Sequence, residues 1–212
     1  MRTILNTWLM SGREKKVLLL RHGDPLSESD ERRFTGQTDP PLSHVGRRQA
    51  KCWQERLSGV PIARIISSDL SRCMETARIL CADRPIIVEP LARLREINLG
   101  GWDGMTFRRV RKRWPDAFRQ RGLEMARFRP PGGESFLDLQ QRVVPVFEEA
   151  VDQAGGNLMI VAHAGVNRMI LCHLLGIPPE NLFRIDQDYG AMNLIGRHAN
   201  GYRVQAINLR PA

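Results

Sequence analysis

The sequence predicts an α/β protein: a three-layer α/β/α sandwich with a mostly parallel central sheet, a C-terminal hairpin and a small helical cap. Continuous apolar runs at residues 17–20 and 158–162 are typical of strands that are buried on both faces. Amphipathic helical segments alternate with these runs, as they do where helices cover both faces of a sheet. An Asn-Gly pair between the apolar stretches 192–197 and 202–208 indicates the hairpin.

We expect residues 1–15 to form a flexible extension and residues 16–212 to form a single domain, with its first strand at 17–20. The first helix follows Ser43, a favoured N-cap residue, and runs to about Leu57. Its expected inward positions are Val45, Cys52, Trp53 and Leu57.

A second strand is predicted at 64–67, where apolar residues follow a proline. The next helix is expected to be capped by Ser71 or Asp69 and to end at about Cys81. The short apolar run at 86–88 lies between two prolines, which favours a strand at the edge of the sheet.

The cap insertion covers about 102–133, and its pattern is mostly helical with an interruption at Pro115. A long amphipathic helix at 134–154, a strand at 158–162 and a helix at about 166–175 follow. The expected inward residues of the long helix are Phe136, Leu139, Val143, Val146, Phe147 and Val151.

Composition excludes several classes of protein. The 212 residues carry a formal net charge of +9. No apolar stretch approaches the roughly 20 residues of a membrane span, and the first residues do not form a signal peptide. The four cysteines lack metal-ligand spacing, so we expect no metal, reduced thiols and a cytoplasmic protein.

Basic residues are concentrated at 108–129, where nine of them stand against Asp116 and Glu124. Such a stretch is typical of a nucleic-acid surface, of an electrostatic funnel for a phosphorylated metabolite, or of a solvated helix face. Aromatic residues are few there and no nucleic-acid-binding motif is present. We therefore expect a small-molecule partner, with neither nucleic acid nor membrane, and the sequence does not indicate an oligomeric state.

Polar side chains follow the predicted strands. Arg21 and His22 come directly after the first strand, and His163 comes after the strand at 158–162. Because ligands bind at the carboxyl ends of parallel strands, we expect these groups to meet at one rim of the sheet, together with Arg72. A lone histidine after a strand is usually structural, so the prediction depends on several strand ends converging. The groups suit an anion.

His22 is the candidate nucleophile, because a neutral imidazole nitrogen attacks phosphorus and forms a phosphoenzyme. Its other ring nitrogen then needs a backbone carbonyl, which we expect near Gly23. Arg21 and Arg72 match phosphoryl oxygens, since a guanidinium is a rigid fork that stays charged. His163 is expected to donate a hydrogen bond to the same oxygens.

Glu96 is the candidate general acid. It lies between Leu94 and Ile97, and apolar neighbours favour the protonated carboxyl that a leaving alkoxide requires. The alternative is a surface carboxylate paired with Arg93 or Arg95.

Several motifs occur in a recognisable order and together span most of the chain. They are Arg21-His22-Gly23, residues 36–43 with Gly46, Gln49 and Ala50, residues 67–77, residues 94–96 with Gly100 and Trp102, residues 131–135, and residues 161–165. In this ordered set the chain resembles the histidine phosphatase superfamily, in the branch that also contains cofactor-dependent phosphoglycerate mutases.

The resemblance implies that His22 is phosphorylated, that Arg21, Arg72 and His163 form the phosphate pocket, and that Glu96 is the acid and base. We also expect Gln37 and Gly165 to contact phosphate. The chain departs from the family at Pro25 and Glu28, where a Thr and an Asn are usual. Part of the phosphate pocket is therefore missing or supplied differently, with Gln37 or a backbone N–H as the candidates.

The predicted function is hydrolysis of a small anionic phosphate ester through a phosphohistidine, without metal or cofactor. The insertion between Glu96 and the Gly-Gly-Glu motif is shorter than in the family's mutases, which favours a phosphatase. Residues 36–43 and 174–178 are most similar to α-ribazole phosphatases of cobalamin biosynthesis, so α-ribazole 5′-phosphate is a candidate substrate. The alternatives are a mutase-type phosphoryl transferase, a catalytically reduced phosphate sensor, and a nucleic-acid-binding module.

Overall fold

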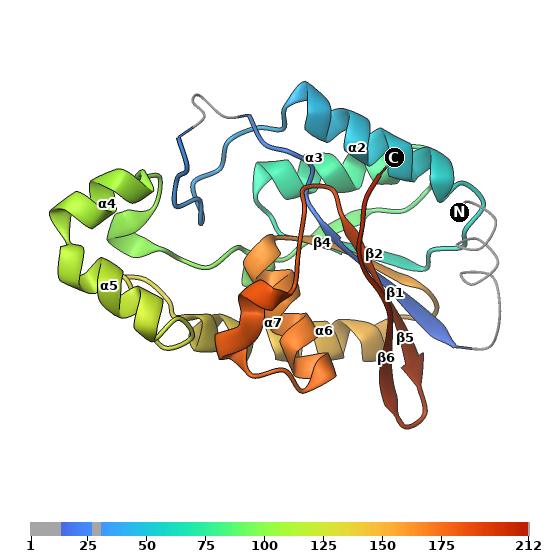
Figure 1. The fold of residues 1–212 in the computed structure, drawn as a ribbon. Coiled ribbons are helices and arrows are strands. Elements are labelled where there is room, and N and C mark those ends of the chain that lie inside the picture. Colours follow the sequence, from blue (N-terminus) through green and yellow to red (C-terminus); the bar gives the residue numbers. More distant parts are fainter. Residues whose placement is uncertain (1–13, 27–30, 212) are drawn as a thin grey trace.

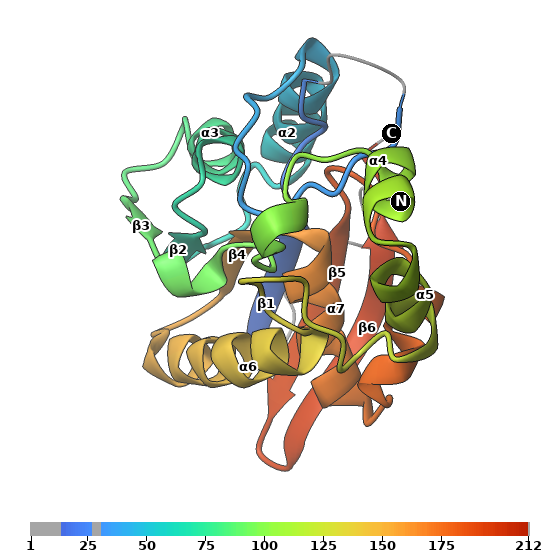
Figure 2. The same ribbon diagram turned by 90° about the vertical axis from the view of Figure 1, so that its left-hand side faces the viewer.

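A six-stranded sheet lies between two layers of helices in the computed structural model, which describes residues 14–26 and 31–211 (Figure 1). Helices α2 (His44–Arg56) and α3 (Ser71–Leu80) cover one face, and α6 (Phe136–Gln153) and α7 (Ala164–Leu175) cover the other (Figure 2). The predicted three-layer α/β/α sandwich is confirmed.

The sheet has the strand order β3-β2-β4-β1-β5-β6. The first four strands in this order pair in parallel, and β5 and β6 complete the sheet as the predicted antiparallel hairpin. The strands are β1 (Lys15–Arg21), β2 (Arg64–Ser67), β3 (Val88–Pro90), β4 (Leu158–Ala162), β5 (Met192–His198) and β6 (Gly201–Leu209).

Two hydrophobic cores explain why the central strands are apolar without alternation. Val17 and Leu19 pack into the core under α6 and α7, whereas Leu18 and Leu20 pack into the core under α2 and α3. Successive strand side chains point to opposite faces, and both faces are covered here. All six residues predicted to face inward on the long helix are buried.

Helix and strand boundaries differ from the sequence prediction where long-range contacts decide them. Neither Ser71 nor Asp69 caps α3, because the N-cap residue is Leu70. The backbone N–H of Ser71 donates instead to the carboxylate of Asp39 at 2.6 Å. Val45 on α2, predicted to face inward, is 44% exposed. The edge strand begins at Val88 rather than at 86, and α7 begins directly after His163 rather than at 166.

The first strand begins earlier than predicted, because β1 already includes Lys15. Residues 1–13 of the predicted flexible extension lie outside the described residues. Within those described, no helix is long and apolar enough to cross a membrane. Cys73, Cys81 and Cys172 are buried free thiols.

The predicted cap is mostly helical, with the expected interruption beside Pro115. It holds α4 (Phe107–Arg113) and α5 (Pro115–Leu123), with Pro115 in the first turn of α5, and the segment after Leu123 contains no further helix until α6. The two cap helices stand beside the sandwich layers in Figure 1. Phe34, from the loop after β1, stacks on Phe107 with ring centroids 4.1 Å apart. This contact fixes the loop against the cap.

Candidate active site

His22 lies directly after β1 and is only 4% exposed. Its Nδ1 is 2.8 Å from the carbonyl oxygen of Gly23, the contact that the sequence predicts. A carbonyl only accepts, so Nδ1 carries the proton and Nε2 keeps its lone pair. Burial, then the charges of Arg21 and Arg72, hold the pKa of His22 well below 6.5, so the ring is neutral near pH 7.

Close backbone packing sets the position of His22. A Cβ on Gly23 would lie 2.5 Å from the carbonyl oxygen of Gly46, so only glycine permits this approach between the end of β1 and α2. The N–H of Gly23 donates to Thr76 Oγ1 on α3 at 3.1 Å. Gly23 therefore contacts both α2 and α3.

Arg72, on the first turn of α3, is the centre of the site and is 1% exposed. Its Nε donates to His22 Nε2, and its Nη2 lies near His163 Nδ1, both at 3.2 Å. The remaining contacts of its guanidinium are with the carbonyl oxygens of Gly36 and Thr38, each at 2.8 Å, and with the Asp39 carboxylate at 3.2 Å. One side chain thus joins both histidines to the loop after β1.

His163, the N-cap residue of α7, is fully buried beside His22. The two rings meet edge to face with centroids 5.1 Å apart. The Nε2 of His163 lies 2.9 Å from Ser68 Oγ, at the end of β2. Burial, followed by the neighbouring His22 and Arg72, holds the pKa of His163 well below 6.5. The ends of β1, β2 and β4 therefore meet as the parallel-strand rule predicts.

Arg21 stacks over Tyr189, with its guanidinium carbon 3.5 Å from the ring centroid. Its Nη1 donates to the carbonyl oxygen of Gln187 at 2.6 Å. Its Nε is buried and has no hydrogen-bond partner among the residues that the structure describes, so this donor is unused. Tyr189 also contacts His22, with ring centroids 5.6 Å apart.

Glu96 is 8% exposed, which excludes the alternative of a solvated surface carboxylate. Its two carboxylate oxygens accept the backbone N–H groups of Ile97 and Gly165, each at 2.9 Å. Arg95 pairs instead with Asp69. Glu96 and Arg21 interact electrostatically, so this carboxyl group lies within range of the Arg21 guanidinium.

Gly165 contacts the carboxyl group of Glu96. Its N–H donates to Glu96, and a Cβ at this position would lie 2.4 Å from Glu96 Oε1. The glycine is therefore needed for the approach of the carboxyl group, whereas its predicted contact to phosphate stays a prediction.

Gln37 lies next to Glu96, since its side-chain amide donates to the Glu96 carbonyl oxygen at 3.2 Å. Pro25, at one of the two departures from the family pattern, pairs with Leu42 in an isolated bridge and has no N–H to offer an anion. Glu28, the other departure, lies outside the described residues.

Sequence patterns missed several residues that organise the site. Asp103 accepts the backbone N–H groups of Gly36, Gln37 and Thr38 at 2.8–2.9 Å, and so shapes the loop whose carbonyls hold Arg72. Tyr189 was also missed. Ser68 and Asp39 lie within the motifs of the sequence, and Ser68 follows a predicted strand, but neither was assigned a role.

The described part of the chain contains no group of three or more His, Cys, Asp or Glu side chains that could hold a metal ion. Positive charge at the site comes from Arg21 and Arg72. What these groups can do without a metal is bind a dianionic phosphoryl group and present a neutral imidazole nitrogen to it.

Comparison with known proteins agrees with this geometry. Residues 17–210 match the model of the histidine phosphatase superfamily, branch 1. Glucosyl-3-phosphoglycerate phosphatase of Mycolicibacterium vanbaalenii is 37% identical over 180 residues, which cover 80% of this chain and 78% of that protein. A 2,3-bisphosphoglycerate-dependent phosphoglycerate mutase of Gloeobacter violaceus is 31% identical over 198 residues, covering 90% of each.

Among solved structures, the α-ribazole phosphatase of Shigella flexneri matches with a TM-score of 0.83 and 25% identity. The match covers 91% of this chain and 96% of that one. In three other mycobacterial relatives, each 33% identical, the chain spans only 52% of the protein's length.

Proposed function

The chain belongs to the histidine phosphatase superfamily, and we propose that it is a phosphomonoesterase that acts on a small anionic ester through a phosphohistidine. The observation that carries the proposal is the state of His22. This ring is neutral, its proton is fixed on Nδ1 by the Gly23 carbonyl, and its Nε2 is directed at the Arg72 guanidinium. A nucleophilic nitrogen beside a phosphate-binding group is what in-line attack on phosphorus requires.

In the first proposed step, a bond forms between Nε2 of His22 and phosphorus, and the bond from phosphorus to the ester oxygen breaks. Glu96 gives its proton to the leaving alkoxide. In the second step, water attacks phosphorus, its proton returns to the Glu96 carboxylate, and the phosphorus–nitrogen bond breaks. Inorganic phosphate leaves and both residues regain their starting forms.

The donors around His22 stabilise the charge that spreads over the phosphoryl oxygens during both steps. Arg72 donates to Nε2 in the structure, so a bound phosphoryl oxygen takes over this donor and frees the nitrogen lone pair. The unpartnered Nε–H of Arg21, His163 and the amide of Gln37 are the further proposed donors. Because two guanidinium groups supply this positive charge, no step needs a metal ion.

The named relatives narrow the range of candidate substrates within the family. Glucosyl-3-phosphoglycerate and α-ribazole 5′-phosphate are the candidates that the named relatives suggest. Transfer between two hydroxyls of phosphoglycerate is the second candidate function, favoured by the match to the Gloeobacter mutase over 90% of both chains.

A panel of phosphate esters tests the proposed function. We expect release of inorganic phosphate from at least one of α-ribazole 5′-phosphate, glucosyl-3-phosphoglycerate and 3-phosphoglycerate, at a rate that excess EDTA does not change. Formation of 2-phosphoglycerate from 3-phosphoglycerate, faster than phosphate release, would establish the mutase instead. A requirement for added Mg²⁺ or Zn²⁺ would contradict the metal-free mechanism. Inactivity on every ester would favour the alternative of a catalytically reduced phosphate sensor.

Glu96→Gln tests the proposed acid. An alkyl phosphate needs a proton on its leaving oxygen, so its kcat should fall by about 10²–10⁴-fold. p-Nitrophenyl phosphate, whose leaving group departs unprotonated, should change far less. Glu124→Gln, an exposed change of the same charge, is the control. Equal losses on the two substrates would show that Glu96 serves structure and not proton transfer.

A further inference from the structure

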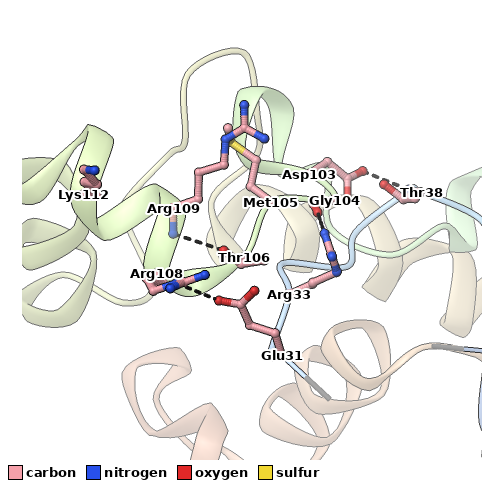
Figure 3. A pocket seen from close by; sticks show the side chains of 10 residues that line it. All are labelled: Glu31, Arg33, Thr38, Asp103, Gly104, Met105, Thr106, Arg108, Arg109 and Lys112. Atoms are coloured by element: carbon pink, nitrogen blue, oxygen red, sulfur yellow. Dashed lines mark hydrogen bonds and ion pairs between the residues drawn. The ribbon is translucent and has the colours of Figure 1, made fainter. Parts of the chain in front are cut away.

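A hollow of about 880 Å³ lies beside α4, where the loop at 31–38 runs along the start of the cap (Figure 3). None of the proposed catalytic or phosphate-binding residues lines it. Four basic side chains and two acidic ones do, namely Arg33, Arg108, Arg109, Lys112, Glu31 and Asp103. The hollow therefore has a net positive lining.

The two acidic side chains are already engaged. Asp103 accepts three backbone N–H groups of the loop at 36–38, and Glu31 pairs with Arg108 at 3.0 Å. Arg33 donates to the carbonyl oxygen of Gly104 at 3.0 Å. Among the residues that the structure describes, the local carboxylates thus leave part of the positive charge of the hollow uncompensated.

Arg109 and Lys112 carry that remaining charge. Within the described ranges, neither side chain has a hydrogen bond or an ion pair. They are three residues apart on α4, so they lie on the same side of the helix, where two like charges destabilise it. An anion between them would remove this repulsion and gain two charge-assisted hydrogen bonds.

We propose that this hollow is a second anion-binding site, which takes a small molecule bearing carboxylate or phosphate groups. Two sources supply such a ligand: the far end of the phosphate ester being hydrolysed, or a separate metabolite. The binding does not depend on the proposed function, whereas the kinetic part of the test below does.

The hollow is connected to the catalytic residues through a single stretch of backbone. Thr38 and Asp103 line the hollow, and Asp103 holds the N–H groups of residues 36–38. The carbonyl oxygens of Gly36 and Thr38 on the same stretch accept hydrogen bonds from Arg72, which contacts His22. A ligand that shifts this loop therefore changes the position of the central guanidinium.

Citrate is the probe for binding, because it is a trivalent carboxylate without a phosphoryl group. The double variant R109Q/K112Q removes the two unpaired charges from the hollow. The double variant R111Q/R113Q removes two exposed charges from the same helix outside the hollow and is the matched control. Calorimetric titration should show citrate binding at least about tenfold weaker in R109Q/K112Q than in the control or the unaltered chain.

Two kinetic measurements separate the two sources. If the far end of the substrate occupies the hollow, R109Q/K112Q raises KM for 3-phosphoglycerate and leaves p-nitrophenyl phosphate hydrolysis unchanged. If a separate metabolite binds, citrate changes kcat for p-nitrophenyl phosphate in the unaltered chain and not in R109Q/K112Q. If the unaltered chain hydrolyses no ester but R109Q/K112Q still binds citrate more weakly than the control, the proposed function is refuted and the anion site is not.

Equal citrate affinity in the two double variants would overturn the proposal, because net charge alone would then explain binding. Absence of saturable citrate binding to the unaltered chain would overturn it as well.

Discussion

His22→Ala is expected to lower turnover of every phosphate ester by roughly 10⁴–10⁶-fold, the loss that follows removal of a nucleophile. No neighbour can replace the ring. His163 Nδ1 faces a donor of Arg72, so its proton lies on Nε2 beside Ser68 Oγ and the ring is a donor, not a nucleophile. Burial raises the pKa of the Cys73 thiol far above neutrality. Steady-state assays with p-nitrophenyl phosphate and with an alkyl ester measure the effect.

His173→Ala is the control for this change. It also removes a histidine side chain, but at an exposed position on α7, where His173 pairs with Glu148 at 3.0 Å. Its turnover should match that of the unaltered chain. Retention of more than about one hundredth of the activity by His22→Ala would point to direct attack by water and away from a covalent intermediate.

Arg72→Lys is expected to lower kcat/KM by about 10³-fold although the charge is kept. A lysine ammonium is a single donor centre and cannot reach both histidines together with the carbonyl oxygens of Gly36 and Thr38. The buried Gly36 carbonyl would lose its partner, at about 1–3 kcal/mol, whereas the part-buried Thr38 carbonyl would lose less, so the melting temperature should also fall by roughly 5 °C.

Arg78→Lys, the same substitution on the exposed side of α3, should change neither quantity. Differential scanning calorimetry and steady-state kinetics separate the two effects of Arg72→Lys. Full activity together with a lowered melting temperature would make Arg72 structural, with no part in phosphate binding.

The fold and the convergence of the site were accessible from sequence because their signals are local. The runs at 17–20 and 158–162 identify buried strands by themselves, and the residues that follow a parallel strand must lie at its carboxyl end. This reasoning brings His22 and His163 together, and the structure places their rings 5.1 Å apart. The contact from His22 to the Gly23 carbonyl follows from the chemistry of a neutral nucleophilic ring.

Other parts of the site depend on contacts between distant segments, which no local pattern encodes. The carboxylate of Asp39 replaces the side-chain cap that α3 lacks, and it lies 32 residues before Ser71. Asp103 shapes the loop at 36–38 from a distance of more than 60 residues. Tyr189 enters the site from the segment before β5, where nothing in the sequence distinguishes it from a core aromatic residue.

Gly165 illustrates a different limit. The motif around it correctly indicates a glycine at the start of a helix beside the site, but a motif does not say which anion the N–H meets. The structure shows the carboxylate of Glu96 in that position. The resemblance thus located the residue, and only the geometry gave its contact.

The central claim is that the phosphoryl group passes through His22, and trapping the enzyme during turnover tests it most directly. The unaltered chain is mixed with substrate, quenched in alkali within milliseconds to seconds, digested and analysed by mass spectrometry. We predict a phosphoryl group on the peptide that contains His22, stable in base, lost in acid and absent from His22→Ala. Phosphate on His163, or an acid-stable phosphate on a serine or cysteine, would contradict the claim.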